Sequence, residues 1–268
     1  MPYRKASGWG RIKPHEGARL DGGDPINQGL VGRFLFNERH QAARFKDIAR
    51  GNWMYNNTGA SLVPGAFGGY AQSYDGVTGA GRVNAVGGAG GKPLISAYPF
   101  TIVAWGKTTG AIVLASMSDE ATDNAYVSLV LVSTSARAYA GDAGGSNYAD
   151  SGAVTTSGVW HQIVGVWNST TDRQIFIDGR YTGINNTSRT PSLATWDNTM
   201  FGVLQRTGAV NFGAGMVDNV SLYNRALSAT EILRLYNEPF AGVVAPRRRI
   251  ISSPPASPGA GRMFFTFS

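Results

Sequence analysis

Residues Gly158–Gly183, GVWHQIVGVWNSTTDRQIFIDGRYTG, are the stretch that decides the fold. Within it, Trp160–Trp167 carries apolar side chains on both faces, which is typical of a strand buried between two layers. Gln174–Asp178 alternates like a second strand, and the dipeptide Asp178-Gly179 favours the two-residue turn whose twist suits a hairpin. The stretch therefore predicts a β-hairpin in the interior of a sheet, with Arg180–Ile184 as the returning strand.

The rest of the chain has the composition of an all-β protein. It has 268 residues, of which 36 are Gly, and only 15% are charged. Many short strands joined by glycine turns give such a composition, and single β-sandwiches commonly reach this length. A chain this long buries enough surface to fold without disulfides. The absence of cysteine favours a bacterial or viral source over an animal extracellular module.

Further strands are predicted on both sides of the hairpin, at Gly29–Phe36, Tyr70–Asp75, Arg82–Val86, Thr101–Trp105, Ala111–Met117, Tyr126–Val132, Arg137–Ala140, Met200–Leu204 and Met216–Tyr223. Loops are predicted at the glycine-rich Gly141–Gly152 and the polar Asn185–Asn198. One helix follows Ser228, which forms a capping box with Glu231. The predicted fold is an all-β, two-sheet antiparallel β-sandwich of the jelly-roll type with one short C-terminal helix.

Basic charge is concentrated at the two ends of the chain. Five basic residues and one acid give residues 1–20 a net charge of +4, and four arginines give residues 241–268 another +4. Since the total is +7, the remainder carries −1. Proline-rich composition predicts that both ends are extended. We expect an extended N-terminal arm at 1–28, a sandwich at 29–237 and a Pro/Arg-rich arm at 238–268.

Five motifs resemble laminin-G-like domains of the concanavalin A-like lectin/glucanase superfamily, of the kind found in phage virion proteins. The hairpin WHQIVGVW…IFIDGR is similar to their central hairpin, and GLVGRFLFN at Gly29–Asn37 to their opening strand. The other three motifs are AQSYDGVTGAGRV at Ala71–Val83, YPFTIVAW at Tyr98–Trp105, and GMVDNVSLYNRALSATEILRLY at Gly215–Tyr236. The resemblance covers about Gly29–Asn237 and implies a jelly roll that binds carbohydrate.

The residues argue against an enzyme. Glycosidases need two carboxylates facing the scissile bond, and the E-x-D-x-x-E pattern of the superfamily's glucanases is missing. None of the five glutamates is predicted on an inward-facing strand next to another acid. His161 is predicted to be structural, and a chain without cysteine or paired histidines does not predict a zinc site.

Calcium is the one optional metal, and no cofactor is required. The resemblance implies that loop oxygens could hold it, and Asp119, Asp123 and Asn124 form a polar turn of that kind. A solvated turn is the alternative interpretation. Asp75 and Asp218 match aspartates of the family, but we expect them to accept hydrogen bonds at a turn or strand end.

Sugar binding would use exposed aromatic rings in loops. Trp53, Tyr55, Tyr148 and Trp196 are the candidates, and the alternative for each is that it covers the edge of the core. The basic run Arg247, Arg248 and Arg249 and the apolar Phe264, Phe265 and Phe267 are predicted to dock the C-terminal arm on a partner.

These residues favour a non-enzymatic phage virion protein, part of the capsid or tail, that displays a glycan-binding jelly roll. Its partners would be other virion proteins, host-surface glycans, and further copies within a particle. A free carbohydrate-binding lectin is the alternative, and a glycan-active enzyme the weakest one. Neither a signal peptide, a transmembrane segment nor a specific nucleic-acid motif is predicted. We therefore expect assembly in the host cytoplasm and a location in the virion.

Overall fold

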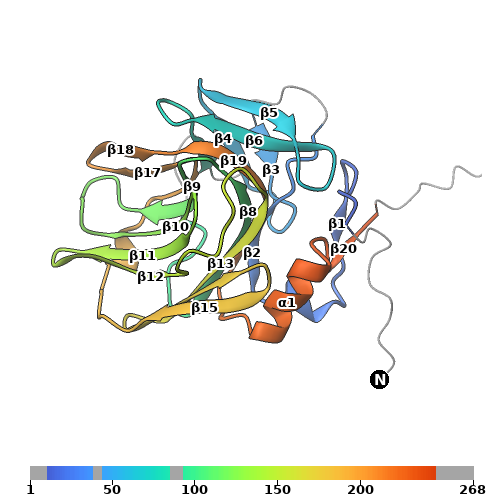
Figure 1. Ribbon diagram of the computed structural model, residues 1–268. Coiled ribbons are helices and arrows are strands. Elements are labelled where there is room, and N and C mark those ends of the chain that lie inside the picture. Colours follow the sequence, from blue (N-terminus) through green and yellow to red (C-terminus); the bar gives the residue numbers. More distant parts are fainter. Residues whose placement is uncertain (1–10, 39–43, 85–92, 246–268) are drawn as a thin grey trace, which may run out of the picture.

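Two antiparallel sheets of eight strands each form the molecule in a computed structural model that describes residues 11–38, 44–84 and 93–245 (Figure 1). Sheet I has the order β12 (Gly145–Asp150), β11 (Ala136–Asp142), β10 (Tyr126–Val132), β9 (Ala111–Ser118), β16 (Asn198–Phe201), β7 (Gly81–Asn84), β4 (Trp53–Asn56), β3 (Arg44–Lys46). Sheet II has the order β15 (Arg180–Asn185), β14 (Asp172–Ile177), β13 (His161–Ser169), β8 (Phe100–Lys107), β19 (Ala214–Tyr223), β6 (Tyr70–Asp75), β5 (Ala60–Pro64). Its eighth strand, β2 (Leu30–Phe34), also pairs with β19. The predicted all-β sandwich is confirmed.

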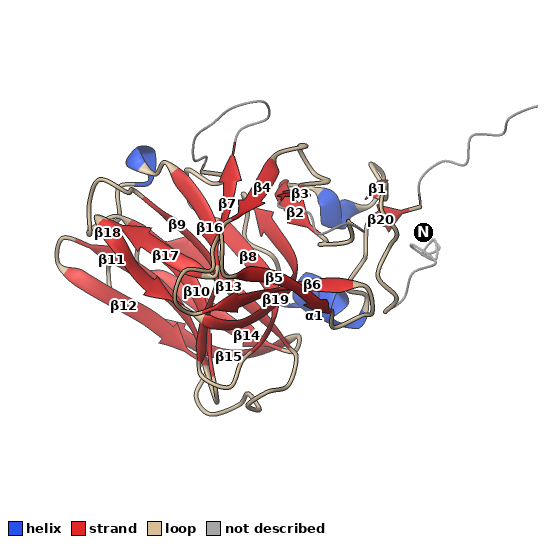
Figure 2. Ribbon diagram, turned by 90° about the horizontal axis from the view of Figure 1, so that it is seen from above, coloured by secondary structure: helices blue, strands red, loops and turns tan. Residues whose placement is uncertain are grey.

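Smaller elements complete the molecule (Figure 2). A separate hairpin is formed by β17 (Val203–Arg206) and β18 (Gly208–Phe212), and a two-stranded ribbon by β1 (Arg19–Leu20) and β20 (Val243–Val244). The helical elements are α1 (Ala229–Asn237) and the 3₁₀ turns η1 (Pro25–Asn27) and η2 (Leu193–Thr195).

The pair WHQIVGVW…IFIDGR is confirmed as β13 and β14, and the hairpin predicted at Asp178-Gly179 as β14 and β15, although β15 lies at the edge of sheet II. Asp178 and Gly179 have φ angles of 50° and 77°, the positive values that this two-residue turn requires. As the alternation predicts, Ile175 faces the core between the sheets, whereas Phe176 faces the opposite side. Strand β14 therefore has both faces covered, whereas β15 is the edge strand of sheet II and carries the exposed Tyr181 and Ile184.

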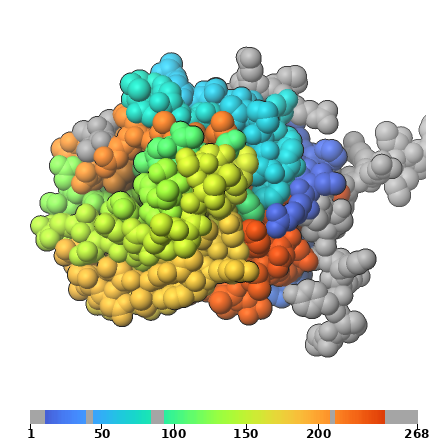
Figure 3. All heavy atoms as spheres, viewed as in Figure 1, coloured from blue at the N-terminus to red at the C-terminus, as the bar shows by residue number. Residues whose placement is uncertain are grey.

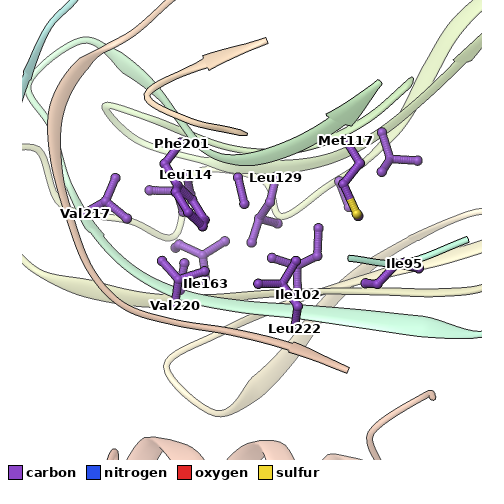
Figure 4. Packing of buried hydrophobic residues seen from close by; sticks show 14 of the residues in the cluster. Ile95, Ile102, Leu114, Met117, Leu129, Ile163, Phe201, Val217, Val220 and Leu222 are labelled. Atoms are coloured by element: carbon purple, nitrogen blue, oxygen red, sulfur yellow. The ribbon is translucent and has the colours of Figure 1, made fainter. Parts of the chain in front are cut away.

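The main core lies between the sheets. Figure 4 shows Leu114, Leu129 and Phe201 of sheet I opposite Ile163 and Val220 of sheet II, and all five side chains are fully buried. Each such side chain contributes about 1.5–3 kcal/mol when it leaves water. This burial sets the alternation of every strand in sheet I, so that the intervening residues point to its outer face.

Helix α1 covers the outer face of sheet II. Its capping box is confirmed, because the Ser228 side chain accepts from the Glu231 amide and the Glu231 carboxylate accepts from the Ser228 amide. Ile232 and Leu235 are buried against the strands beside Phe176. Among the described residues, no helix has the length and apolar character needed to cross a membrane.

The described parts of both predicted arms pack against the sandwich. Lys13 forms a buried ion pair with Asp218 of β19, and Arg19 and Leu20 pair in β1 with the β20 strand near the other end of the chain. After α1, Phe240 and Val243 are fully buried. Residues 11–28 and 238–245 are thus held to the sandwich. Within the described chain, the predicted domain limits at 29 and 237 therefore do not mark the start of free arms.

Two predicted elements are wrong in detail. Gly141–Gly152 is not a loop: Tyr139 pairs with Tyr148, which makes β11 and β12 a hairpin. Met200–Leu204 is not one strand either. Gly202 has a φ of 79°, which breaks the strand, so that β16 stays in sheet I and β17 leaves it.

Candidate functional site

A groove of about 500 Å³ lies on the outer face of sheet I. Its floor consists of outward-pointing side chains of β10 and β11, namely Tyr126, Ser128, Val130, Arg137 and Tyr139. The residues between them, such as Val127 and Ala138, belong to the core. The same burial that fixes the register of sheet I therefore fixes which side chains line the groove.

The β17–β18 hairpin forms one wall of the groove. Ser116 of β9 donates a hydrogen bond of 2.7 Å to the Val203 carbonyl, and the Val113 carbonyl accepts from the Gly202 amide at 2.9 Å. Leu204 is 4% exposed and packs on Tyr126. In Figure 3 the orange part of this hairpin lies above the green strands β10 to β12. The break at Gly202 is thus what places a wall over the sheet.

Tyrosine rings and arginine side chains are paired along the groove. The Arg206 guanidinium lies 4.9 Å from the centre of the Tyr126 ring at the wall. The Arg137 guanidinium lies 4.7 Å from the Tyr148 ring, whose centre is 4.6 Å from that of Tyr139. Each stacked pair holds flat, amphipathic surface in a fixed orientation. Such surface suits the stacking of a sugar ring together with hydrogen bonds to its hydroxyl groups.

The charges around the groove are arranged with the cations inside. Arg137 Nε donates to Asp150 Oδ2 at 2.8 Å, and this hydrogen bond raises the pKa of Arg137. Arg206 Nη1 donates to the Asp123 carbonyl at 3.2 Å. Neither aspartate is among the described residues that line the groove. The groove therefore offers donors and aromatic surface without a carboxylate.

The four predicted sugar-stacking residues are in three different places. Tyr148 flanks the groove at Arg137 and is 36% exposed. Trp53 and Tyr55 are on β4, toward the other side of sheet I, and Tyr55 is 36% exposed. Trp196 is only 4% exposed and meets Phe100 edge-on in the core, so its faces cannot stack on a sugar. That candidate is wrong, because the loop that carries it folds inward.

Trp53 lines a second cavity of about 500 Å³, between β3, β4 and the N-terminal segment. Its indole ring already packs against the guanidinium of Arg44, at 4.6 Å. Glu16 and Glu38 also line this cavity, and burial raises the pKa of Glu38. The structure therefore separates Trp53 from Tyr148 and gives it a different environment.

The candidate calcium ligands have partners of their own. Asp119 is 6% exposed and accepts from the Ala121 amide at 2.8 Å, and the Asp123 carboxylate lies 4.0 Å from Arg206 Nε. Asp119 and Asn124 line a polar cavity of about 590 Å³ at the end of sheet I, without Asp123. Within the described chain, no three His, Cys, Asp or Glu side chains come together as a metal site.

The remaining candidates have structural partners or lie outside the described residues. Asp75 accepts from the amides of the turn that follows it, and His161 Nδ1 lies 2.7 Å from Asp178 Oδ2. The predicted docking residues Arg247, Arg248, Arg249, Phe264, Phe265 and Phe267 lie outside the described residues.

Sequence reasoning missed Tyr126, Arg137, Tyr139 and Arg206 as groove residues. A signal for three of them was present, since the predicted strands Tyr126–Val132 and Arg137–Ala140 place alternate residues on one face. Arg206 gave no such signal, because its position depends on the strand break at Gly202.

Several solved structures that resemble this chain are described together with carbohydrates. Domain 4 of the arabinanase AbnA from Geobacillus stearothermophilus, in complex with arabinotriose, has a TM-score of 0.59 and 13% identity over 82% of this chain and 100% of that one. Trypanosoma rangeli sialidase has a TM-score of 0.57 and 21% identity over 78% of this chain and 33% of that one. A structure of botulinum neurotoxin type C has a TM-score of 0.56 and 12% identity over 79% of this chain and 51% of that one. Its description states that cell entry of this toxin depends on interaction with two ganglioside molecules. At these identities the likeness shows the fold alone.

Sequence comparison places the chain in a family. No curated protein sequence matches it. The family model described as the concanavalin A-like lectin/glucanases superfamily matches residues 88–233, more than half of the 268 residues. That range contains β10, β11 and the β17–β18 wall of the groove. The chain belongs to the concanavalin A-like lectin/glucanases superfamily.

Proposed function

We propose that this domain binds glycans in the groove on the outer face of sheet I. The observation that carries the proposal is the pairing of Tyr126 with Arg206 and of Tyr148 with Arg137 along one groove. Tyrosine rings offer apolar faces for sugar rings, and the arginines and Ser128 supply polar groups beside them. The resemblance to arabinanase, sialidase and toxin structures described with carbohydrate ligands supports the same class of ligand.

A glycan panel tests this proposal. Tyr139→Ala and Tyr148→Ala should each weaken binding of the glycans selected by the wild-type protein at least about tenfold, because each removes aromatic surface. Tyr181→Ala is the matched control, since Tyr181 is 52% exposed on β15 of the opposite sheet. Equal binding by all three variants would contradict a groove site.

We propose that binding is not followed by hydrolysis. Glycoside hydrolysis needs a pair of carboxyl groups, and the described lining of the groove contains neither Asp nor Glu. Prolonged incubation with the selected glycan should release no reducing ends. Steady release that disappears on substitution of one Asp or Glu would contradict this.

We propose that the domain requires no metal and holds calcium at most weakly, near Asp119, Asp123 and Asn124. Asp119 already accepts a hydrogen bond from the Ala121 amide, and the Asp123 carboxylate lies in a 4.0 Å ion pair with Arg206. Thermal melts with calcium and with chelator should nearly coincide, whereas a large stabilisation by calcium would contradict the proposal.

We propose that the chain is displayed on a phage particle and joined to other virion proteins by its ends. The net charge of +4 on residues 241–268 supports attraction to an acidic neighbour. A free lectin is the second candidate, favoured by the groove alone. The full chain should sediment with particles, and a chain ending at Ala245 should not. Equal behaviour of both chains would favour the free lectin.

A further inference from the structure

The charged side chains that line the groove are both cationic. They are Arg137 on the floor and Arg206 on the wall, and each has an ion-pair partner, Asp150 at 2.8 Å and Asp123 at 4.0 Å. Asp150 and Asp123, their nearest acidic neighbours, lie outside this lining. A cleft lined by one sign of charge concentrates ligands of the opposite sign.

Both guanidinium groups are fixed in place with donors left over. Arg137 is held by Asp150 through Nε and by the Tyr139 hydroxyl through Nη1. Arg206 is held by the Asp123 carbonyl through Nη1, and its buried Nε faces the Asp123 carboxylate at 4.0 Å. The hydrogen bonds among described residues leave Nη2 of both arginines without an acceptor. A fixed guanidinium with free donors matches the geometry of a carboxylate or sulfate group.

The two cations lie at different places along the groove. Arg206 stacks on Tyr126, at the start of β10, whereas Arg137 pairs across the ladder with Val130. Four residues separate the backbone positions of Tyr126 and Val130, which is about 13 Å at the usual rise of a β-strand, and the Arg137 guanidinium reaches back from this level to the Tyr139 hydroxyl. Tyr139 and Ser128 lie on the floor along the same strands. The arrangement suits a chain of sugars that carries negative groups at intervals.

We infer that the groove selects acidic oligosaccharides, whose carboxylate or sulfate groups bind Arg206 and Arg137. The inference rests on the proposed glycan function and adds the chemical class of the ligand. The tyrosines would bind the sugar rings of acidic and neutral glycans alike. The arginines would supply the preference for the acidic ones.

Calorimetry with matched probes tests the inference. Oligogalacturonides are compared with their methyl esters, which remove only the charge, and dextran sulfate with dextran, which separates sulfate from carboxylate recognition. At least one acidic probe should bind about tenfold or more tightly than its neutral partner. This preference should shrink as ionic strength rises from about 0.01 to about 0.15 M, because the Debye length falls from about 30 to about 8 Å.

Variants assign the preference to the groove. Arg206→Gln should weaken binding of the acidic probe about tenfold more than it weakens binding of the neutral probe, because Arg206 also supports the Tyr126 ring. Arg180→Gln removes the same charge from an exposed position on β15 and should have no effect. Since Arg206→Gln could disturb the hairpin, its melting temperature is compared with that of the wild type, and the acidic-to-neutral ratio of the wild type tests the inference by itself.

Three outcomes would overturn the inference. Equal binding of acidic and neutral probes, both weakened by Tyr139→Ala, would remove the acidic class and leave the proposed glycan function intact. If Arg206→Gln and Arg180→Gln reduce binding of the acidic probe equally, the probe is attracted by the net charge of the chain and not by a site in the groove. Failure of every acidic and neutral probe to bind would contradict the proposed function as well.

Discussion

Lys13 and Asp218 form an ion pair across 205 positions of sequence, and their side chains are only 3% and 0% exposed. Burial lowers the pKa of Lys13 and raises that of Asp218. The Lys13 amide also donates to the Phe67 carbonyl at 3.1 Å, and Asp218 Oδ2 accepts from the Ala66 amide at 3.0 Å. This pair makes the N-terminal segment a part of the sandwich.

Removing one partner of this pair should destabilise the protein severely. Lys13→Met leaves the Asp218 carboxylate buried without its cation, which typically costs about 3–5 kcal/mol. Combining it with Asp218→Asn removes both charges and keeps an oxygen for the Ala66 amide, so stability should recover in large part. Urea unfolding measures both. A double variant as unstable as Lys13→Met would contradict this account of the pair.

Asp75 should make stability depend on acid pH. Hydrogen bonds from the amides of Val77, Thr78 and Gly79 hold the pKa of its carboxyl well below the ordinary 3.8. Because the folded-state pKa is depressed, the stabilisation is present above about pH 3.8 and is lost as pH falls below that value. Asp75→Asn should therefore lose less stability than the wild type between about pH 5 and about pH 2. Parallel urea-midpoint curves for the two proteins would contradict the assignment.

Trp196 and Tyr148 should have opposite roles, although both were candidates for sugar stacking. Trp196→Ala opens a cavity beside Phe100 and should cost about 3–5 kcal/mol. Tyr148→Ala removes an exposed ring and should change stability little while weakening glycan binding. Urea unfolding and calorimetry on both variants give the comparison. A stable Trp196→Ala protein with impaired binding would reverse the assignment.

The end of the sandwich should lie beyond α1. The fully buried Arg33 guanidinium donates to the Ala241 and Pro239 carbonyls at 2.8 Å, and Phe240 is fully buried. A chain ending at Ala245 should fold, whereas one ending at Asn237 should not, because it loses these acceptors and the Phe240 side chain. Circular dichroism melts distinguish the two. A cooperative melt of the shorter chain at the wild-type temperature would contradict this boundary.

Much of the fold was predictable because its signals are local. Gln174–Asp178 alternates at the period of a strand, and Ser228 with Glu231 is a capping box, so both elements were placed correctly. The strand break at Gly202 and the burial of Trp196 depend on contacts with β9 and Phe100, which are distant in sequence.

The site was less predictable for the same reason. Tyr148 is a predicted exposed ring, but its contact with Tyr139 and Arg137 depends on the pairing of β11 with β12, and β12 lies within the predicted loop Gly141–Gly152. Arg206 reaches the groove only because β17 folds over sheet I. These residues come together through strand register and through a wall formed by another segment. A single sequence does not show such long-range contacts.

Backbone amide NMR during titration with the tightest-binding glycan tests the central claim most directly. The account predicts that the largest, saturable shifts fall on β10, β11 and the β17–β18 hairpin, centred on Tyr126, Tyr139 and Arg206. Residues around Trp53 should shift little, because they line a separate cavity. Shifts centred on Trp53 and Lys46, with the groove unchanged, would contradict the assignment of the groove as the binding site.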